Sequence, residues 1–309
     1  MKRALVTGAS GFLGAALVER LVAAGVEVLV LHRPGADLWR LKAVQGRYRA
    51  ITADLREPGT YRAPLIQARP DTVFHLAWTG VGSRHRDEWV QVEGNLHATL
   101  ALVMEAADAG CAHFIGAGSQ AEYGPQNRVL DEGAPTRPST LYGAAKLSAY
   151  HLASRLSANR GMRFAWLRVF STYGPRDNSG WMLPTLIQAL LRGERPTLTA
   201  GEQRWDYLHV ADAVEAFYRV GLTAEAADVF NLGSGEARPL RQVIELIRDR
   251  IDPALPLGFG EVPYRPDQVM WLQADTRRLQ SVTGWKVSRT LEEGLADTVA
   301  WHQSQRRSP

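Results

Sequence analysis

The sequence of 309 residues has a single cysteine, Cys111, which excludes an internal disulfide bond. It has no apolar run long enough to span a membrane and no hydrophobic targeting region before the first predicted strand. The formal net charge is +4, but the basic residues are not gathered into one tract. We therefore expect a cytoplasmic protein with a buried structural cysteine and with neither a membrane partner nor a nucleic-acid partner.

Apolar residues, in contrast, make up 45% of the chain, which is enough for a sizeable core. Stretches typical of helices alternate with short apolar runs at residues 4–6, 26–31, 72–76, 113–115 and 164–169. Strands that are joined by helical crossovers form parallel sheets with helices on both faces. The sequence therefore predicts an α/β fold with a doubly wound, mostly parallel sheet, and ligand chemistry at the carboxyl ends of its strands.

The first apolar run leads directly into glycines at positions 8, 11 and 14. Glycines let the backbone turn sharply and pass close to a pyrophosphate, and the helix predicted from about Phe12 to Ala24 would point its positive end at that anion. The alternative is a tight strand-to-helix turn without a ligand. The pattern predicts a dinucleotide site whose phosphate cradle contains Gly8, Ser10, Gly11, Phe12, Leu13 and Gly14.

His32 and Arg33 follow the second apolar run, where an NAD pocket commonly places a carboxylate that accepts from the ribose 2′-hydroxyl. An arginine cannot accept a hydrogen bond, but it pairs well with a 2′-phosphate. This favours NADP(H), with NAD(H) as the alternative if Arg33 points into solvent. Asp54 and Leu55 follow the next short strand and are expected on the adenine side, where Asp54 would accept from the adenine amino group or form a turn.

Residues 72–80 contain the end of the fourth predicted strand, and we expect Leu76, Ala77 and Trp78 beside the nicotinamide, with Thr79 facing the substrate. His75 lies inside the apolar run, which is typical of a hydrogen-bonded core histidine. A long amphipathic helix is predicted from Glu88 to Gly110. Within it, Asn95 would anchor a water or the backbone near the site, or make a packing contact.

Three polar residues farther along could carry acid–base chemistry. Ser119 stands at the end of the fifth predicted strand, and Tyr142 and Lys146 are four residues apart on one face of a predicted helix. The ammonium and a bound oxidised nicotinamide would lower the pKa of the tyrosine, and Ser119 could bind the same substrate oxygen. Combined with the cradle, this set predicts proton and hydride transfer at a carbonyl.

With these motifs the chain resembles the extended short-chain dehydrogenase/reductase family, in its nucleotide-sugar epimerase, dehydratase and reductase branch. The resemblance covers nearly the whole chain. It rests on residues 7–14, 73–77, Asn95, Ser119 with 123–124, Tyr142, Lys146, 167–175, 203–212, 230–235 and 284–285. It implies that Ser119, Tyr142 and Lys146 are the catalytic set, that Tyr142 and Lys146 also contact the cofactor, and that no metal is used.

Departures from the family pattern reduce the number of family reactions that the chain could catalyse. Dehydratases of the family carry acidic residues directly after the catalytic serine or threonine, whereas this chain has Gln120 and Ala121 there, and Glu122 comes one position too late. Dehydration is therefore disfavoured. In the usual Arg-Asp-Phe triplet, Trp205 replaces the arginine that often reaches the substrate diphosphate. The implied substrate-binding residues are Thr79, Gln120, Ser171, Arg204 and Arg265.

Segments 118–124, 203–207 and 263–270 look most like reductases of nucleotide-linked 4-keto-6-deoxyhexoses, which implies NADPH-dependent reduction at C4 with Tyr142 as general acid. An NAD-dependent nucleotide-hexose 4-epimerase is the alternative, and a non-catalytic cofactor-sensing protein is a third hypothesis. We expect a Rossmann NAD(P)-binding domain at 1–175. A smaller substrate-binding lobe is expected at 176–309, with some segments returning to the Rossmann sheet. The resemblance also implies a homodimer formed by the helices near 88–110 and 142–159.

Overall fold

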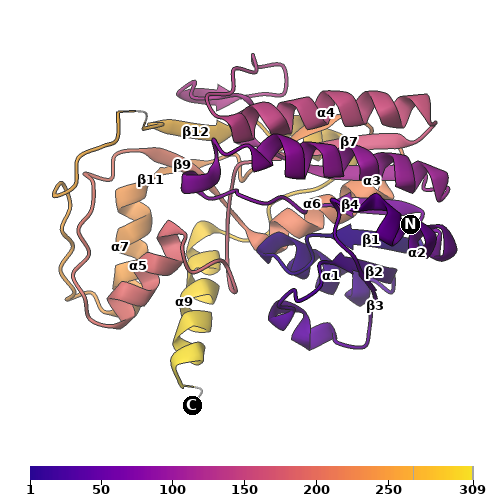
Figure 1. Cartoon of the computed structure of the whole chain (residues 1–309). Coiled ribbons are helices and arrows are strands. Elements are labelled where there is room, and N and C mark those ends of the chain that lie inside the picture. Colours follow the sequence, from indigo (N-terminus) through magenta and orange to yellow (C-terminus); the bar gives the residue numbers. More distant parts are fainter. Residues whose placement is uncertain (267, 308–309) are drawn as a thin grey trace.

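Seven parallel strands form the larger sheet of the protein (Figure 1). The computed structural model describes residues 1–266 and 268–307. In their order across the sheet, the strands are β10 (Val229–Leu232), β7 (Arg163–Val169), β5 (His113–Ser119), β4 (Thr72–His75), β1 (Arg3–Thr7), β2 (Glu27–His32) and β3 (Arg49–Thr52). Each neighbouring pair is parallel. The predicted doubly wound sheet is therefore confirmed.

The strands are apolar on both faces because helices cover both faces. Leu5 and Val6, which point to opposite sides of β1, are both fully buried. Strand β5 runs four residues beyond its predicted end, since Gly116 and Gly118 leave room for the Trp166 side chain of β7. A Cβ atom on Gly116 would lie 2.2 Å from that ring.

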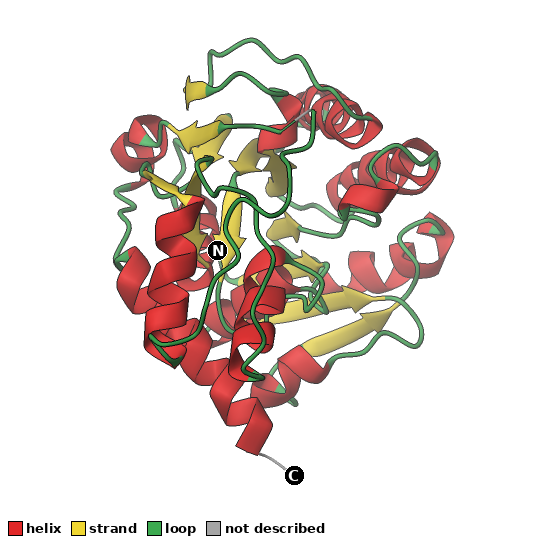
Figure 2. Ribbon diagram, turned by 90° about the vertical axis from the view of Figure 1, so that its left-hand side faces the viewer, coloured by secondary structure: helices red, strands yellow, loops and turns green. Residues whose placement is uncertain are grey.

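One face of the sheet is covered by α1 (Phe12–Ala23), α6 (Val210–Leu222) and α8 (Arg277–Thr283). The opposite face is covered by α2 (Pro58–Ala68), α3 (His97–Asp108) and α4 (Leu141–Asn159). Figure 2 shows helices on either side of the strands. In the described part of the chain, none of the helices is long and apolar enough to cross a membrane.

The helix predicted from Glu88 to Gly110 begins instead as a π-helical turn, η3 (Gln91–Leu96), and continues as α3. Asn95 explains the wider turn, because its side chain pairs with both backbone groups of Thr79 at 2.8 Å. Short 3₁₀ turns also occur outside this region. These are η1 (Trp39–Val44), η2 (Ser83–His85) and η4 (Gln120–Glu122).

A second, five-stranded sheet was not foreseen from the sequence. Its strands are β11 (Ala237–Pro239), β9 (Arg204–His209), β12 (Trp271–Ala274) and β6 (Arg128–Leu130), in that order, and β8 (Ser171–Tyr173), which pairs with β9. Three helices, α5 (Met182–Leu191), α7 (Leu240–Ile251) and α9 (Leu291–Arg307), pack together beside it around a separate apolar core. Most of these strands have only three or four residues, too few for a clear alternation in the sequence.

The chain crosses between the two sheets more than once. Strand β6 lies between β5 and α4 in the sequence, yet it pairs with β12 of the second sheet. Strand β10 comes from the C-terminal half, yet it pairs with β7 of the larger sheet. The domain boundary at residue 175 stays a prediction.

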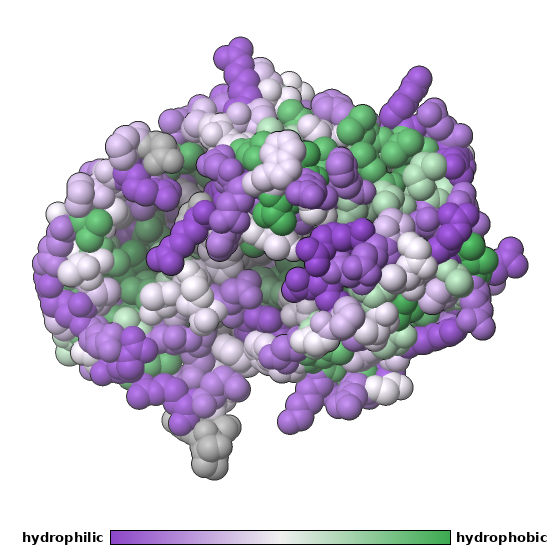
Figure 3. All heavy atoms as spheres, in the orientation of Figure 1, coloured by the Kyte–Doolittle hydropathy of each residue, from purple (hydrophilic) through white to green (hydrophobic). Residues whose placement is uncertain are grey.

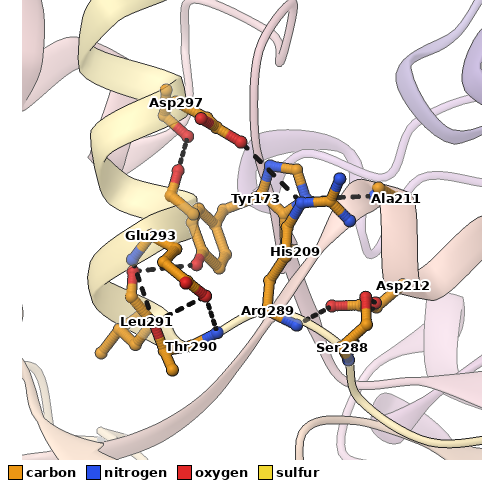
Figure 4. A network of polar contacts seen from close by, with 12 residues as sticks. Tyr173, His209, Ala211, Asp212, Ser288, Arg289, Thr290, Leu291, Glu293 and Asp297 are labelled. Atoms are coloured by element: carbon orange, nitrogen blue, oxygen red, sulfur yellow. Dashed lines mark hydrogen bonds and ion pairs between the residues drawn. The ribbon is translucent and has the colours of Figure 1, made fainter.

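A polar network joins helix α9 to α6 and the second sheet (Figure 4). The Asp212 carboxylate accepts hydrogen bonds from the Ser288 backbone and hydroxyl and from the Arg289 backbone. Tyr173 donates from its hydroxyl to the Leu291 carbonyl at 3.3 Å. These contacts fix the entry to α9 without using the residues of the predicted active site.

Candidate active site

A cavity of about 250 Å³ opens at the carboxyl ends of β1, β2, β3 and β4. This is the point where the strand order of the sheet reverses, which is where doubly wound proteins bind ligands. Many of the predicted cofactor residues line it, namely Gly8, Ser10, Gly11, His32, Arg33, Asp54, Leu55, Leu76, Ala77 and Trp78. Predicted cradle residues Phe12, Leu13 and Gly14 belong to the first turn of α1 beside it.

The turn between β1 and α1 fits a dinucleotide phosphate. A Cβ atom on Gly14 would lie 2.1 Å from the Gly8 carbonyl oxygen, so the backbone there can pack only with glycine. Gly8 has a φ of +72° and packs against the Ala77 backbone. The N-cap residue Gly11 is extended and no side chain caps the helix. The first N–H groups of α1 therefore remain available to an anion.

The adenine-side end of the cavity is rich in charge. His32 is the last residue of β2 and Arg33 follows it, while Asp54 and Arg56 follow β3. Arg56 donates from Nη2 to Asp54 Oδ2 at 2.6 Å, and hydrogen bonds from Arg56 lower the pKa of Asp54 to about 2. Asp54 is thus an ionised acceptor that already has a partner. Sequence reasoning missed Arg56, although the short Asp-Leu-Arg spacing could have indicated this pair.

The segment after β4 forms the opposite wall of the cavity. Trp78 donates from its indole nitrogen to Gln91 Oε1 at 2.7 Å, and Thr79 is held by Asn95. Asn95 therefore anchors backbone at the site, one of the two roles expected for it. Gln91, which holds both Trp78 and the loop carbonyls of Gly80 and His85, was not foreseen.

His75 is a core histidine, as expected. Its ring nitrogens contact the hydroxyls of Thr7 at 2.8 Å and Thr99 at 2.9 Å. Burial, together with the nearby charge of Lys146, lowers the pKa of His75 to about 3. It is therefore neutral at physiological pH and contributes no charge to the site.

Trp78 contacts two of the three predicted catalytic residues, Tyr142 and Lys146, and the third, Ser119, bonds Tyr142. The ring of Tyr142 makes an edge contact with Trp78 at 6.2 Å between centres, and Ser119 is its hydrogen-bond partner. Burial raises the pKa of Tyr142, and the hydrogen bond with Ser119 and the charge of Arg86 counteract this in part. In the protein alone, Tyr142 is thus a protonated donor at neutral pH.

Lys146 is buried beside these two residues. Its Nζ donates to the Ala117 carbonyl at 2.6 Å and lies 3.7 Å from the centre of the Trp78 ring. Burial lowers the pKa of Lys146 to about 7, and the negative charge of Glu122 raises it in part. The charge of this lysine is therefore finely balanced at physiological pH.

The predicted substrate residues lie at several places. Thr79 lines the cavity, Gln120 is partly exposed in η4, and Ser171 begins β8 opposite Tyr207. Arg204 donates to the Ala237 carbonyl and lies 6.0 Å from the centre of the Trp271 ring. These roles, including that of Arg265, stay predictions. One position of the segment 263–270, Asp267, lies outside the described residues.

Successive residues of a strand point to opposite faces, so Arg204 and Trp205 of β9 do not face the same side. Trp205 packs into the apolar cluster that contains Tyr123 and Phe170, close to the Ser119 turn. Arg204 therefore points to the opposite face of β9 from Trp205, the residue that replaces the family arginine.

The model of the NAD dependent epimerase/dehydratase family matches residues 4–233. The chain belongs to this family. The match confirms the resemblance to extended short-chain dehydrogenases/reductases, and it supports a nicotinamide dinucleotide as the cofactor.

Family members with several activities align along nearly the whole chain. The dTDP-glucose 4,6-dehydratase of Streptomyces griseus is 30% identical over 316 residues, covering 98% of this chain and 94% of the relative. The GDP-6-deoxy-D-mannose reductase of Pseudomonas aeruginosa is 28% identical over 317 residues, covering 99% of each chain. The crystal structure of UDP-glucose 4-epimerase from Thermus thermophilus with NAD has a TM-score of 0.86 at 27% identity, covering 97% of this chain and 99% of that one.

Proposed function

We propose that the protein is an NADPH-dependent reductase of a nucleotide-linked 4-keto-6-deoxyhexose, acting at C4 of the sugar. The proposal rests on one observation, the identity and contacts of the three residues that follow Ser119. Gln120 and Ala121 cannot exchange protons, and Glu122 is fully buried and bound to Ser119, Trp166 and Arg168. An acid–base group for dehydration is thus lacking in the turn that supplies it in dehydratases, while the groups for carbonyl chemistry are in place.

Each residue of the set has a distinct task in this reaction. The bound dinucleotide supplies the hydride to the sugar carbonyl. Tyr142 donates a proton from its hydroxyl to the C4 oxygen, and its raised pKa keeps that proton available at neutral pH. Ser119 holds the same oxygen. Lys146 binds the nicotinamide ribose, and its ammonium favours the negative charge that Tyr142 acquires when it gives up the proton.

The cofactor proposal rests on the charged end of the cavity. His32 and Arg33 occupy the place where an NAD site commonly offers a carboxylate, and a guanidinium there pairs with a 2′-phosphate. Titration of the purified protein with NADPH and NADH tests this. We expect preference for NADPH and no nucleotide carried through purification, because a reductase exchanges its cofactor in every turnover.

An NAD-dependent nucleotide-hexose 4-epimerase is the second candidate. It uses the same three residues, and the epimerase from Thermus thermophilus binds NAD. Tightly retained NAD in the purified protein would favour this candidate over the reductase, and Arg33 would then be a bystander.

Replacement of the proton donor tests the reaction itself. We expect Tyr142→Phe to reduce turnover of dTDP- and CDP-linked 4-keto-6-deoxyhexoses by at least ~100-fold, because positioned acid–base groups commonly supply that much. The oxidation of NADPH is followed by absorbance. Tyr218→Phe, on α6 away from the cavity, is the matched control. Near-normal turnover of Tyr142→Phe would contradict the assignment.

A further inference from the structure

Glu122 is a buried carboxylate that the proposed reaction does not use as an acid or base. Its side chain has no exposed surface. It accepts hydrogen bonds from the Ser119 backbone N–H at 2.9 Å, from the Trp166 indole at 2.9 Å and from Arg168 Nε at 2.7 Å. Such a carboxylate is costly to bury unless its bonds are satisfied, and here they are.

The hydrogen bond between Glu122 and Ser119 is one of two reciprocal bonds that close a small turn. Ser119 Oγ accepts from the Ala121 N–H at 3.1 Å, while Glu122 reaches back to the Ser119 N–H, which is a capping box. The bond from Ala121 occupies one lone pair of the Ser119 hydroxyl and restricts its rotation. Glu122 therefore fixes the backbone from which Ser119 reaches Tyr142.

Trp166 contacts both this carboxylate and the lysine. Lys146 Nζ lies 5.7 Å from the centre of the Trp166 ring, and the indole nitrogen of that ring donates to Glu122. The other titratable groups around Lys146 are His75, which is neutral, Tyr142, which is protonated, and Arg86, which lies 5.5 Å from the Tyr142 ring centre. Arg168 is paired with Glu122. Glu122 is thus the negative charge that acts on Lys146.

We propose that Glu122 is a positioning residue of the active site. Its carboxylate holds the Ser119 turn in place and supplies a negative charge that favours the ammonium form of Lys146. The kinetic part of this inference rests on the proposed function, whereas the electrostatic part concerns the protein alone.

Arg168 holds Glu122 in this role. Its guanidinium carbon lies 4.5 Å from the ring centre of Tyr123, whose hydroxyl donates to Asn231 Oδ1 at 2.7 Å. Asn231 in turn donates to the Leu130 carbonyl of β6 at 2.8 Å. The carboxylate is therefore fixed from the larger sheet and from the second sheet together.

The chain allows a direct measurement of the Lys146 charge, because it contains only four lysines, at positions 2, 42, 146 and 286. Protein labelled with ¹³C at the lysine ε-carbon should give four NMR signals, and Lys146→Arg assigns the buried one. We expect the Lys146 signal to titrate near pH 7 in the native protein. In Glu122→Gln we expect its midpoint at lower pH, because the loss of a nearby negative charge disfavours the ammonium.

Asp206→Asn is the matched control. Asp206 is also a fully buried carboxylate, and it accepts from Ser234, Gly235 and Ala274 in the second sheet. Its replacement should cost stability without moving the Lys146 midpoint. If Glu122→Gln fails to fold, Glu122→Gln with Arg168→Met removes both charges of the pair and should give a smaller shift in the same direction, because the loss of the Arg168 positive charge opposes it.

An unchanged Lys146 midpoint in the Glu122 variant, or an equal shift in Asp206→Asn, would overturn the electrostatic role. The NMR titration needs no substrate, so its outcome is independent of whether the protein is a reductase. In a reductase, a downward shift of about one pH unit lowers kcat ~10-fold at pH 8 and much less at pH 6. A loss of the same size at both pH values would show that Glu122 supports only the fold.

Discussion

At the scale of single residues, Arg33 and Asp54 bring opposite charges to the same end of the cavity. Asp54 is already bound by Arg56, whereas Arg33 is an exposed side chain that lines the cavity. A 2′-phosphate would therefore meet Arg33 without first having to displace the Asp54 carboxylate from a guanidinium.

Replacement of Arg33 by alanine should weaken NADPH binding ~10- to 100-fold, because a hydrogen bond to a charged group contributes roughly 1.5–3 kcal/mol. NADH binding should hardly change, since it lacks the phosphate. Fluorescence titration with both cofactors measures this. Arg47→Ala, at an exposed arginine outside the cavity, is the control. Equal losses for both cofactors would contradict a role in choosing between them.

The pH dependence of reduction should follow Lys146. Its ammonium is present below a pKa of about 7 and is lost above it, whereas Tyr142 stays protonated because burial raises its pKa. We expect kcat/KM for reduction to be level at acid pH and to fall above pH 7. Lys146→Arg, which stays charged throughout, should lose this alkaline fall even if its activity is lower. The same fall in both proteins would assign it to another group.

The proximity of residues within one motif could be predicted from the sequence, whereas the partners of buried charges could not. Tyr142 and Lys146 share a helix, so their spacing alone places them together; in the structure Tyr142 bonds Ser119 and Lys146 bonds the Ala117 carbonyl of the same strand. The pairing of Glu122 with Arg168 spans 46 positions and depends on β5 lying beside β7. A pattern within one segment carries no signal for such a contact.

At the scale of elements, the turn from β1 to α1 leaves no room for a side chain at Gly14. Gly14→Ala would bring a methyl group within 2.1 Å of the Gly8 carbonyl oxygen. We expect the free energy of unfolding to fall by about 1–3 kcal/mol, as in other overpacked sites, and cofactor binding to weaken. Urea unfolding and NADPH titration measure the two effects.

Gly59→Ala is the control for this turn, because a Cβ atom on that glycine of α2 meets no atom within 4 Å. Alanine is also the better helix former, so its stability should be unchanged or higher. If Gly14→Ala were as stable as Gly59→Ala, the close packing of the cradle would not limit the fold.

The predicted ends of elements were accurate where the apolar runs were long. The predicted helix over 88–110 was wrong in its first part, because the π-helical turn depends on Asn95 binding the Thr79 backbone across the site. Helical periodicity reports which face is buried, but it does not register a widened turn that a side chain from another segment imposes.

At the scale of the whole molecule, apolar side chains gather on the surface over α3 and α4 (Figure 3). Leu152 belongs to α4 and is 47% exposed. We predict a homodimer formed by these helices, which sedimentation equilibrium at micromolar concentration should detect. Leu152→Glu should shift it toward monomer, whereas Leu222→Glu, at the similarly exposed end of α6, should not. A monomeric native protein would contradict the prediction.

The parallel sheet of the larger lobe followed from the alternation of apolar runs and helical stretches along the chain. The second sheet did not, because its short strands come from distant parts of the sequence. Sequence patterns describe neighbours along the chain, and this sheet is assembled from residues that are far apart in it.

The exchange of β6 and β10 between the sheets means that the protein has no single hinge. Several chain segments connect the two sheets, so a hinge motion that separates the sheets would have to bend all of these segments together. For the same reason, a gene cut at codon 175 would encode two incomplete pieces, each lacking a strand held by the other.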